Sequence, residues 1–266
     1  MRFRKIALAL FACMALGALA ANVAQAAPEW TLGTTENQTT AGTRIVKEGV
    51  SCKKHGTSGL ELTSKFLGAP VKLTATGIDC VGATIDTVVN KEGVGISAHS
   101  AGQLLFTEVK VVEPANCEVG GVKHELLTAA LTDEVIMDAT SGSTTVFDKF
   151  FTDKKIEKEK EVEVPFVTVT FEGALCSIKG ESAPVKGTAC GEAVHTVEES
   201  GKLVFKPNAT GTLTKVQTLS FGSAQQSTGG CALTLGKEPA FVTGAVDNEL
   251  NGSVTPANAG KPFGAD

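Results

Sequence analysis

Aromatic residues with a polar edge are nearly absent, since the chain has one tryptophan, Trp30, and no tyrosine. Sites that bind sugars usually stack the sugar ring on Trp or Tyr, so the sequence offers little for such a platform. A rim of Asn, Thr and Asp side chains would still bind a glycan through hydrogen bonds. A glycan-binding module therefore stays an alternative.

Arginine is scarce, and the positive charge is too low to favour a polyanionic partner. Arg44 is the single arginine after residue 26, so the planar guanidinium that grips phosphate is almost missing. Three of the 24 basic residues lie within residues 1–26, and the other 21 face 29 acidic residues, which gives a net charge of −8. Because this charge repels phosphate polyanions, we predict no nucleic-acid partner.

No motif for a metal ion or a cofactor is complete. His124-Glu125-Leu126-Leu127-Thr128 lacks the second histidine of a helical H-E-x-x-H zinc site. Cys52 and His55 offer two soft ligands, but no second pair with ligand spacing stands elsewhere. We therefore predict no cofactor and no metal site.

One serine stands in a run that resembles a catalytic motif. Ala98-His99-Ser100-Ala101-Gly102 matches a variant of the nucleophile elbow of some small lipases. That elbow needs a strand that turns sharply into a helix, whereas the following residues 103–112 are typical of a strand. An aspartate before His195 would complete the hydrolase order, and such spacing is often met by chance; the candidates are Asp133, Asp138 and Asp148. We predict no catalytic residue and no enzyme, with a secreted serine hydrolase using Ser100 as an alternative.

The first 26 residues have the pattern of a secretory signal peptide. A basic start at residues 1–5 precedes an apolar segment, Ile6 to Ala20, and Ala24-Gln25-Ala26 offers the small residues that a signal peptidase accepts. We predict a mature protein that begins at Ala27, has no transmembrane segment and is secreted, extracellular or held in the cell envelope. Acylation at Cys13 is an alternative, which the large neighbouring Phe11 disfavours.

Six cysteines follow this segment, an even number that predicts three disulfides in an oxidising compartment: Cys52, Cys80, Cys117, Cys176, Cys190 and Cys231. Six cysteines allow fifteen pairings. Cys176 and Cys190 end consecutive apolar runs with a turn-like segment, residues 180–182, between them, so we expect them to face each other on antiparallel strands. Cys80 with Cys117 is the second expected pair, which leaves Cys52 with Cys231.

The remaining pattern is typical of β-strands. From about Ile45 onward, short runs of alternating apolar and polar residues are separated by Gly, Pro, Asn and Ser. Residues 123–136 fit either an amphipathic helix or a strand, and the charged run 153–161 is typical of a solvated hairpin or loop. We predict an all-β fold, an antiparallel β-sandwich or a barrel-like fold stapled by disulfides. It forms one β-rich domain over 45–266, after a flexible lead-in over 27–44.

Several segments resemble a group of secreted, β-rich, cysteine-containing proteins of soil actinobacteria that have no known activity. The resemblance extends over most of the mature chain, and these segments carry it: VKLTATGIDC at 71–80, FTEVKVVEPANCEV at 106–119, FVTVTFEGALC at 166–176, LVFKP at 203–207 and PFG at 262–264. In that group a cysteine is expected where this chain has Val109. Because of this difference, no partner for Cys80 or Cys117 can be taken over from the group. It implies an exported β-rich fold and leaves the activity open.

Taken together, these features favour a non-catalytic protein that is secreted or associated with the envelope. We expect a structural, adhesive or ligand-binding role with an extracellular or cell-envelope partner of unknown identity.

Overall fold

A computed structural model describes residues 30–32, 43–57, 59–89, 96–121, 123–137, 145–152, 154–157, 160–199, 202–205, 216–222 and 231–265. Within these ranges nearly all regular structure is strand, and the one helical element is a 3-10 turn, η1 (Pro256–Asn258). No helix of the described residues is long and apolar enough to cross a membrane. The predicted all-β, antiparallel, disulfide-stapled fold is confirmed.

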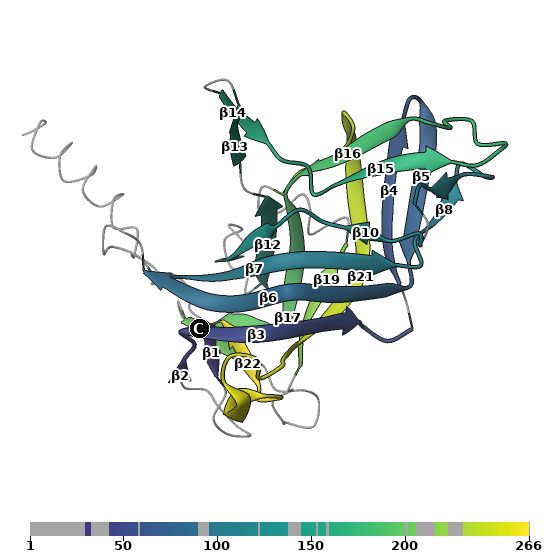
Figure 1. The fold of residues 1–266 in the computed structure, drawn as a ribbon. Helices are drawn as coiled ribbons and strands as arrows, with labels where there is room; N and C mark the ends of the chain where they lie inside the picture. Colours follow the sequence, from purple (N-terminus) through teal and green to yellow (C-terminus); the bar gives the residue numbers. More distant parts are fainter. Residues whose placement is uncertain are drawn as a thin grey trace, which may run out of the picture.

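Eight strands form a closed antiparallel barrel (Figure 1). In order around the barrel they are β3 (Lys47–Lys54), β6 (Gly77–Val89), β7 (Ile96–Thr107), β11 (Leu131–Met137), β12 (Thr145–Thr152), β17 (Ala189–Glu199), β19 (Val216–Phe221) and β21 (Glu238–Leu250). The ring closes because β21 pairs with β3, where Asn248 lies opposite Cys52. A closed ring leaves no unpaired edge.

A second sheet continues from the barrel and shares β21 with it. Its order is β9 (Glu118–Val119), β15 (Val167–Glu172), β16 (Ser182–Gly187), β20 (Leu233–Leu235), β21, β4 (Leu60–Phe66), β5 (Ala69–Ala75) and β8 (Lys110–Glu113). β21 passes from this sheet into the barrel at Gly244, whose φ of +121° favours glycine. A Cβ at Gly244 would also lie 2.9 Å from the carbonyl oxygen of Gly59.

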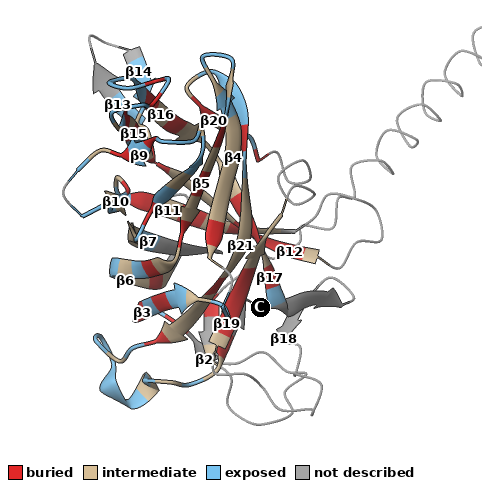
Figure 2. Cartoon of the chain, turned by 90° about the vertical axis from the view of Figure 1, so that its right-hand side faces the viewer, coloured by how far each residue is buried: buried red, intermediate tan, exposed pale blue. Residues whose placement is uncertain are grey.

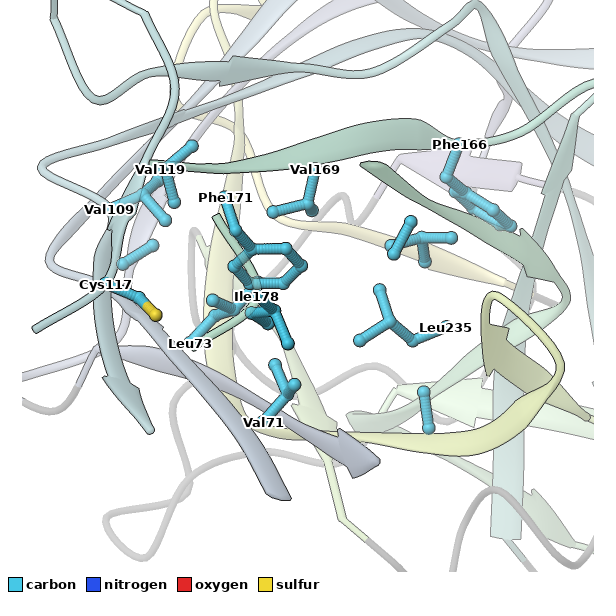
Figure 3. Close-up of a cluster of buried hydrophobic side chains, with 14 of the residues drawn as sticks. Val71, Leu73, Val109, Cys117, Val119, Phe166, Val169, Phe171, Ile178 and Leu235 are labelled. Atoms are coloured by element: carbon cyan, nitrogen blue, oxygen red, sulfur yellow. The ribbon is translucent and has the colours of Figure 1, made fainter. Parts of the chain in front are cut away.

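The inner face of the second sheet holds a large apolar cluster (Figure 3). Val169, Phe171 and Leu235 are fully buried in it, and Phe66 stacks on Phe171 with ring centroids 5.9 Å apart. Along the strands, buried residues alternate with more exposed ones, while exposed residues gather at loops such as the β4–β5 turn (Figure 2). This is the period of two that predicted strands from the sequence.

A small sheet at one end of the barrel includes two short strands from the segment 27–44, which we predicted to be a flexible lead-in. It consists of β2 (Thr43–Arg44), β1 (Trp30–Leu32) and β22 (Phe263–Ala265). Trp30 is 3% exposed and packs on Phe263 with ring centroids 5.8 Å apart. Burying the large indole against the barrel orders this part of the segment.

The segment with two possible structures is a strand. Residues 123–136 contain β10 (Leu126–Leu127) and most of β11, both of which pair with β7. Leu131, Asp133 and Val135 alternate toward the interior. The long-range pairing that closes the barrel excludes the helix, because these residues form one of its eight strands.

Two further pairings complete the described strands. The charged run forms an exposed hairpin of β13 (Lys154–Glu157) and β14 (Lys160–Glu163), as predicted, in which Lys154 Nζ lies 2.8 Å from Glu161 Oε2. β18 (Lys202–Phe205) pairs with the end of β17.

All six cysteines are bridged, but the predicted pairing is wrong in all three cases. The bridges are Cys52–Cys80, Cys117–Cys176 and Cys190–Cys231, with Cα–Cα distances of 5.2, 4.5 and 5.9 Å. The hairpin expected around Cys176 and Cys190 does exist as β15 and β16. Its turn holds Cys176, whereas Cys190 belongs to β17, beyond the opposite end of the hairpin, so the two cysteines do not face each other.

A cavity in the barrel as candidate functional site

The barrel interior contains a cavity of about 190 Å³. Its lining includes Trp30 and Phe263 of the small end sheet and Val169, Val185 and Leu233 of the second sheet. Most of the other lining side chains are also apolar. The cavity therefore extends from the barrel interior to the inner face of the second sheet and favours an apolar occupant.

Small residues at inward positions explain why side chains do not fill this space. Ala83, Gly102 and Ala189 line the cavity. Gly191, on the same strand as Ala189, is covered by Phe221, because a Cβ at Gly191 would lie 2.9 Å from that ring. An eight-stranded barrel is just wide enough for its side chains to fill, so a few small residues leave room for a ligand.

Two aspartates from neighbouring strands face this cavity. In the β11–β12 ladder, Asp133 lies opposite Phe150 and Val135 lies opposite Asp148, which places both carboxyl groups on the same face as diagonal neighbours. Asp133 is 1% exposed and Asp148 is 3% exposed. Their side chains are hydrogen bonded to each other.

Burial raises the pKa of Asp148 well above its usual range, and the charge of Asp133 and the hydrogen bond to it raise this pKa further. Ionising both of two adjacent buried carboxyl groups is energetically unfavourable, because their negative charges repel each other. Ionising Asp148 is therefore less favourable than ionising a carboxyl group exposed to solvent.

Other buried polar atoms at this cavity have no hydrogen-bond partner among the described residues. They are Trp30 Nε1, Asp148 Oδ1 and both side-chain polar atoms of Gln217, a residue that is 1% exposed and lies opposite Asn248. Buried polar atoms are nearly always paired, since an unpaired one costs about 1–3 kcal/mol. These donors and acceptors are thus available to a bound molecule.

The charge of the cavity lining is of one sign. The described residues that line it include Glu61, Asp133 and Asp148, and none of them is Lys, Arg or His. Glu61 has a counter-charge at the surface, where its Oε2 lies 2.8 Å from Lys72 Nζ. No cation is among the causes that act on the pKa of Asp148.

The serine named from the sequence does not have the geometry of a nucleophile elbow. Ser100 lies opposite Ile85 in the middle of β7, and that strand continues to Thr107. No strand-to-helix turn exists at this point. Asp133 and Asp148 do face one cavity, while Asp138 lies outside the described residues and so does the side chain of His195.

The residues considered for metal binding have other partners. Cys52 is bridged to Cys80, and His55 Nδ1 lies 2.8 Å from Asp247 Oδ1. His124 Nδ1 lies 3.2 Å from the carbonyl oxygen of Val119. In the part of the chain that the structure describes, no three His, Cys, Asp or Glu side chains gather as a metal site would require.

The sequence interpretation named Asp133 and Asp148 only as possible triad members and missed Gln217 and Trp30 as cavity residues. A signal for Asp133 exists, because the alternation of Leu131 and Val135 puts this carboxyl on an apolar face. For Gln217 no comparable signal exists, since its neighbours do not reveal which face is buried.

Comparisons with protein-family models, with curated proteins and with solved structures find no match to this chain.

Proposed function

We propose that this protein is a non-catalytic binding protein that holds a small, mainly apolar molecule inside its barrel. The observation that carries the proposal is the cavity of about 190 Å³, whose lining is apolar except for a few buried polar atoms without partners. An apolar cavity of about 150 Å³ binds benzene, so this one suits a molecule of roughly eight non-hydrogen atoms.

The three disulfides support a site of action outside the cytoplasm, in an oxidising compartment. Together with the signal-like start of the chain, they favour a role in which the protein captures its ligand in the medium or the cell envelope. A structural or adhesive role would not require an internal cavity with unpaired polar atoms.

Trp30 gives a direct test, because it is the only tryptophan, no tyrosine is present, and it lines the cavity. Toluene added to the mature protein is expected to change the Trp30 fluorescence in a saturable way. Calorimetric titration is expected to show heat of binding over the same range of toluene concentration. Ala189→Leu adds volume inside the cavity and should weaken binding by about tenfold or more.

The matched control is Val194→Leu on the same strand, because Val194 alternates to the outer face and is 40% exposed. This variant should bind toluene like the wild type, and circular dichroism should show that both variants are folded. Absence of saturable binding in the wild type would overturn the proposal, as would equal binding by a folded Ala189→Leu variant.

A further inference from the structure

Gln217 is a buried glutamine on a strand that faces the cavity. Leu219 and Phe221 follow it at alternate positions of β19 and also line the cavity, so the period of two places Gln217 on the same inner face. Its side chain is 1% exposed, and among the described residues neither its Oε1 nor its Nε2 has a hydrogen-bond partner. The strand therefore presents an amide with open hydrogen-bonding capacity to the cavity.

Other polar side chains of the barrel have partners, unlike that of Gln217. Gln103 also lines the cavity, and its Nε2 donates a hydrogen bond to the carbonyl oxygen of Thr128 over 2.7 Å. Thr218, the next residue of β19, points to the opposite face and donates from its Oγ1 to Asp247 Oδ1 over 2.8 Å. An unpaired buried amide destabilises a fold, so the amide of Gln217 suits a role in binding rather than in stability.

A second donor without a partner lies in the same part of the barrel. Leu219 and Leu250 flank Gln217, one on its own strand and the other diagonally across the ladder to β21, and both belong to the apolar cluster that contains Trp30. Among the described residues, nothing accepts a hydrogen bond from Trp30 Nε1. The site thus offers N–H donors on Gln217 and Trp30 and one carbonyl acceptor, Gln217 Oε1.

We propose that the ligand of this cavity is a small neutral lactam or primary carboxamide, which pairs with the side-chain amide of Gln217 while its apolar body fills the remaining space. This inference rests on the proposed function. In a lactam or a primary amide an N–H lies on the same side as the carbonyl oxygen, whereas in a trans secondary amide the two point apart. Such a group therefore donates to Gln217 Oε1 and accepts from Gln217 Nε2 at the same time.

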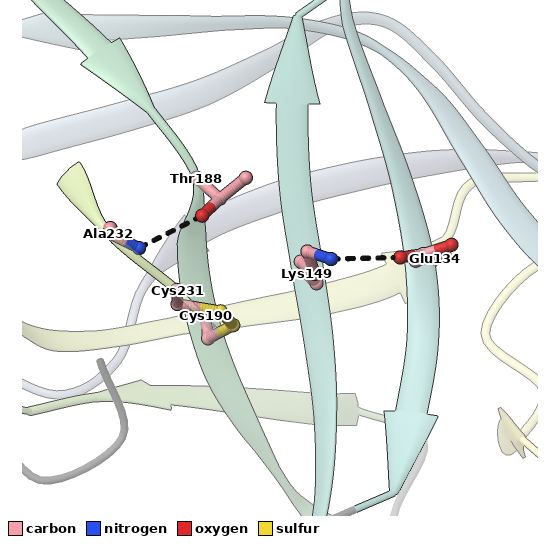
Figure 4. The surroundings of a disulfide bond; sticks show 6 residues. All are labelled: Glu134, Lys149, Thr188, Cys190, Cys231 and Ala232. Atoms are coloured by element: carbon pink, nitrogen blue, oxygen red, sulfur yellow. Dashed lines mark hydrogen bonds and ion pairs between the residues drawn. A yellow bond between two sulfur atoms is a disulfide. The ribbon is translucent and has the colours of Figure 1, made fainter. Parts of the chain in front are cut away.

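Charged ligands of the same size match this site less well. An ammonium ion accepts no hydrogen bond, so it would leave the N–H donors of Gln217 and Trp30 unpaired. A carboxylate would leave Gln217 Oε1 unpaired, and it would meet no cation among the described lining residues. Lys149 on β12 lies on the outer face of the barrel, where its Nζ is 3.1 Å from Glu134 Oε1 (Figure 4).

Calorimetric titration of the mature protein with four small probes tests the inference: the lactam 2-piperidone, cyclohexanone, toluene and pentanoate. In a cavity without partners, the N–H of the lactam would lose its hydration without replacement, and 2-piperidone would bind about tenfold or more weakly than cyclohexanone. The partners on Gln217 should instead make 2-piperidone bind at least as tightly as cyclohexanone, with pentanoate weakest at pH 7. Weaker binding of 2-piperidone than of cyclohexanone would overturn the amide assignment, and so would tighter binding of pentanoate than of 2-piperidone.

Gln217→Met removes the amide and keeps a side chain of similar length. This variant should bind 2-piperidone about tenfold or more weakly than the wild type, and toluene at least as tightly. Its urea midpoint without ligand should rise, because the unpaired polar atoms are gone; a lower midpoint would show that the amide has a partner in the free protein, against the proposal. Gln103→Met is the matched control and should keep the wild-type ratio of the affinities for 2-piperidone and cyclohexanone.

The outcomes separate this inference from the proposed function. If toluene binds but Gln217→Met leaves the ratio of the two affinities unchanged, the amide assignment is wrong and the proposed function stands. If none of the four probes binds, the proposed function fails as well. The comparison of 2-piperidone with cyclohexanone needs only the wild type, so it decides the case in which Gln217→Met does not fold.

Discussion

Replacing Asp148 by Asn should change how the stability of the protein depends on pH. Compared with the wild type, the variant should gain stability as the pH rises from acid to neutral. Asp148 is 3% exposed, and burial raises its pKa well above the ordinary value of 3.8. The folded state thus holds a proton that the unfolded state has released, over the pH range between 3.8 and the raised value. In this range the stability of the wild type falls as the pH rises, and below it the group contributes no pH dependence.

The magnitude follows from the proton count. One proton of difference between the two states gives a slope of about 1.4 kcal/mol per pH unit. An asparagine has the same shape, does not titrate and can donate a hydrogen bond to Asp133. The free energy of unfolding of the variant, minus that of the wild type, should therefore increase with pH from about pH 4 upward.

Urea unfolding with intact disulfides, followed by the fluorescence of Trp30 from pH 3 to 8, measures this difference. Glu134→Gln is the matched control, because it changes a carboxyl group on the outer face of the same strand, β11, and should run parallel to the wild type. If the curves for Asp148→Asn and the wild type also ran parallel, Asp148 would have an ordinary pKa and the reasoning on the buried pair would be wrong.

Three other outcomes are expected. Peptide mapping without reduction should recover Cys52–Cys80, Cys117–Cys176 and Cys190–Cys231, and any other linkage would contradict the fold. Replacing both Cys190 and Cys231 by Ser should lower the free energy of unfolding by about 4 kcal/mol in the chain-entropy model, which urea unfolding measures, since their separation is 41 residues. Phe171→Ala should cost about 3–5 kcal/mol, whereas Leu175→Ala, at a side chain that is 78% exposed, should leave the urea midpoint nearly unchanged.

Local patterns in the sequence were enough to predict the class of fold. The alternation of Cys231, Leu233 and Leu235 predicts a strand with one buried face, and all three are buried. The charge run at 153–161 predicts a solvated hairpin, which exists as β13 and β14. Such features depend on the period of two and on turn residues, both of which neighbouring residues along the chain set.

Pairings between distant segments were decided only by the tertiary structure. Cys190 is bridged to Cys231 because β16, which leads into Cys190, pairs with β20, which follows Cys231, and no local pattern encodes that neighbourhood. The closure of β21 on β3 likewise joins residues about 200 positions apart.

The candidate site depends on the same long-range pairings. Asp133 and Asp148 are adjacent because of the register of one ladder, and Gln217 reaches the same cavity because β17 pairs with both β12 and β19. The amino-acid sequence determined which side chains alternate toward an interior. Whether that interior is filled or hollow, and which polar groups meet there, depends on the strand order and the summed volumes of residues far apart in the chain.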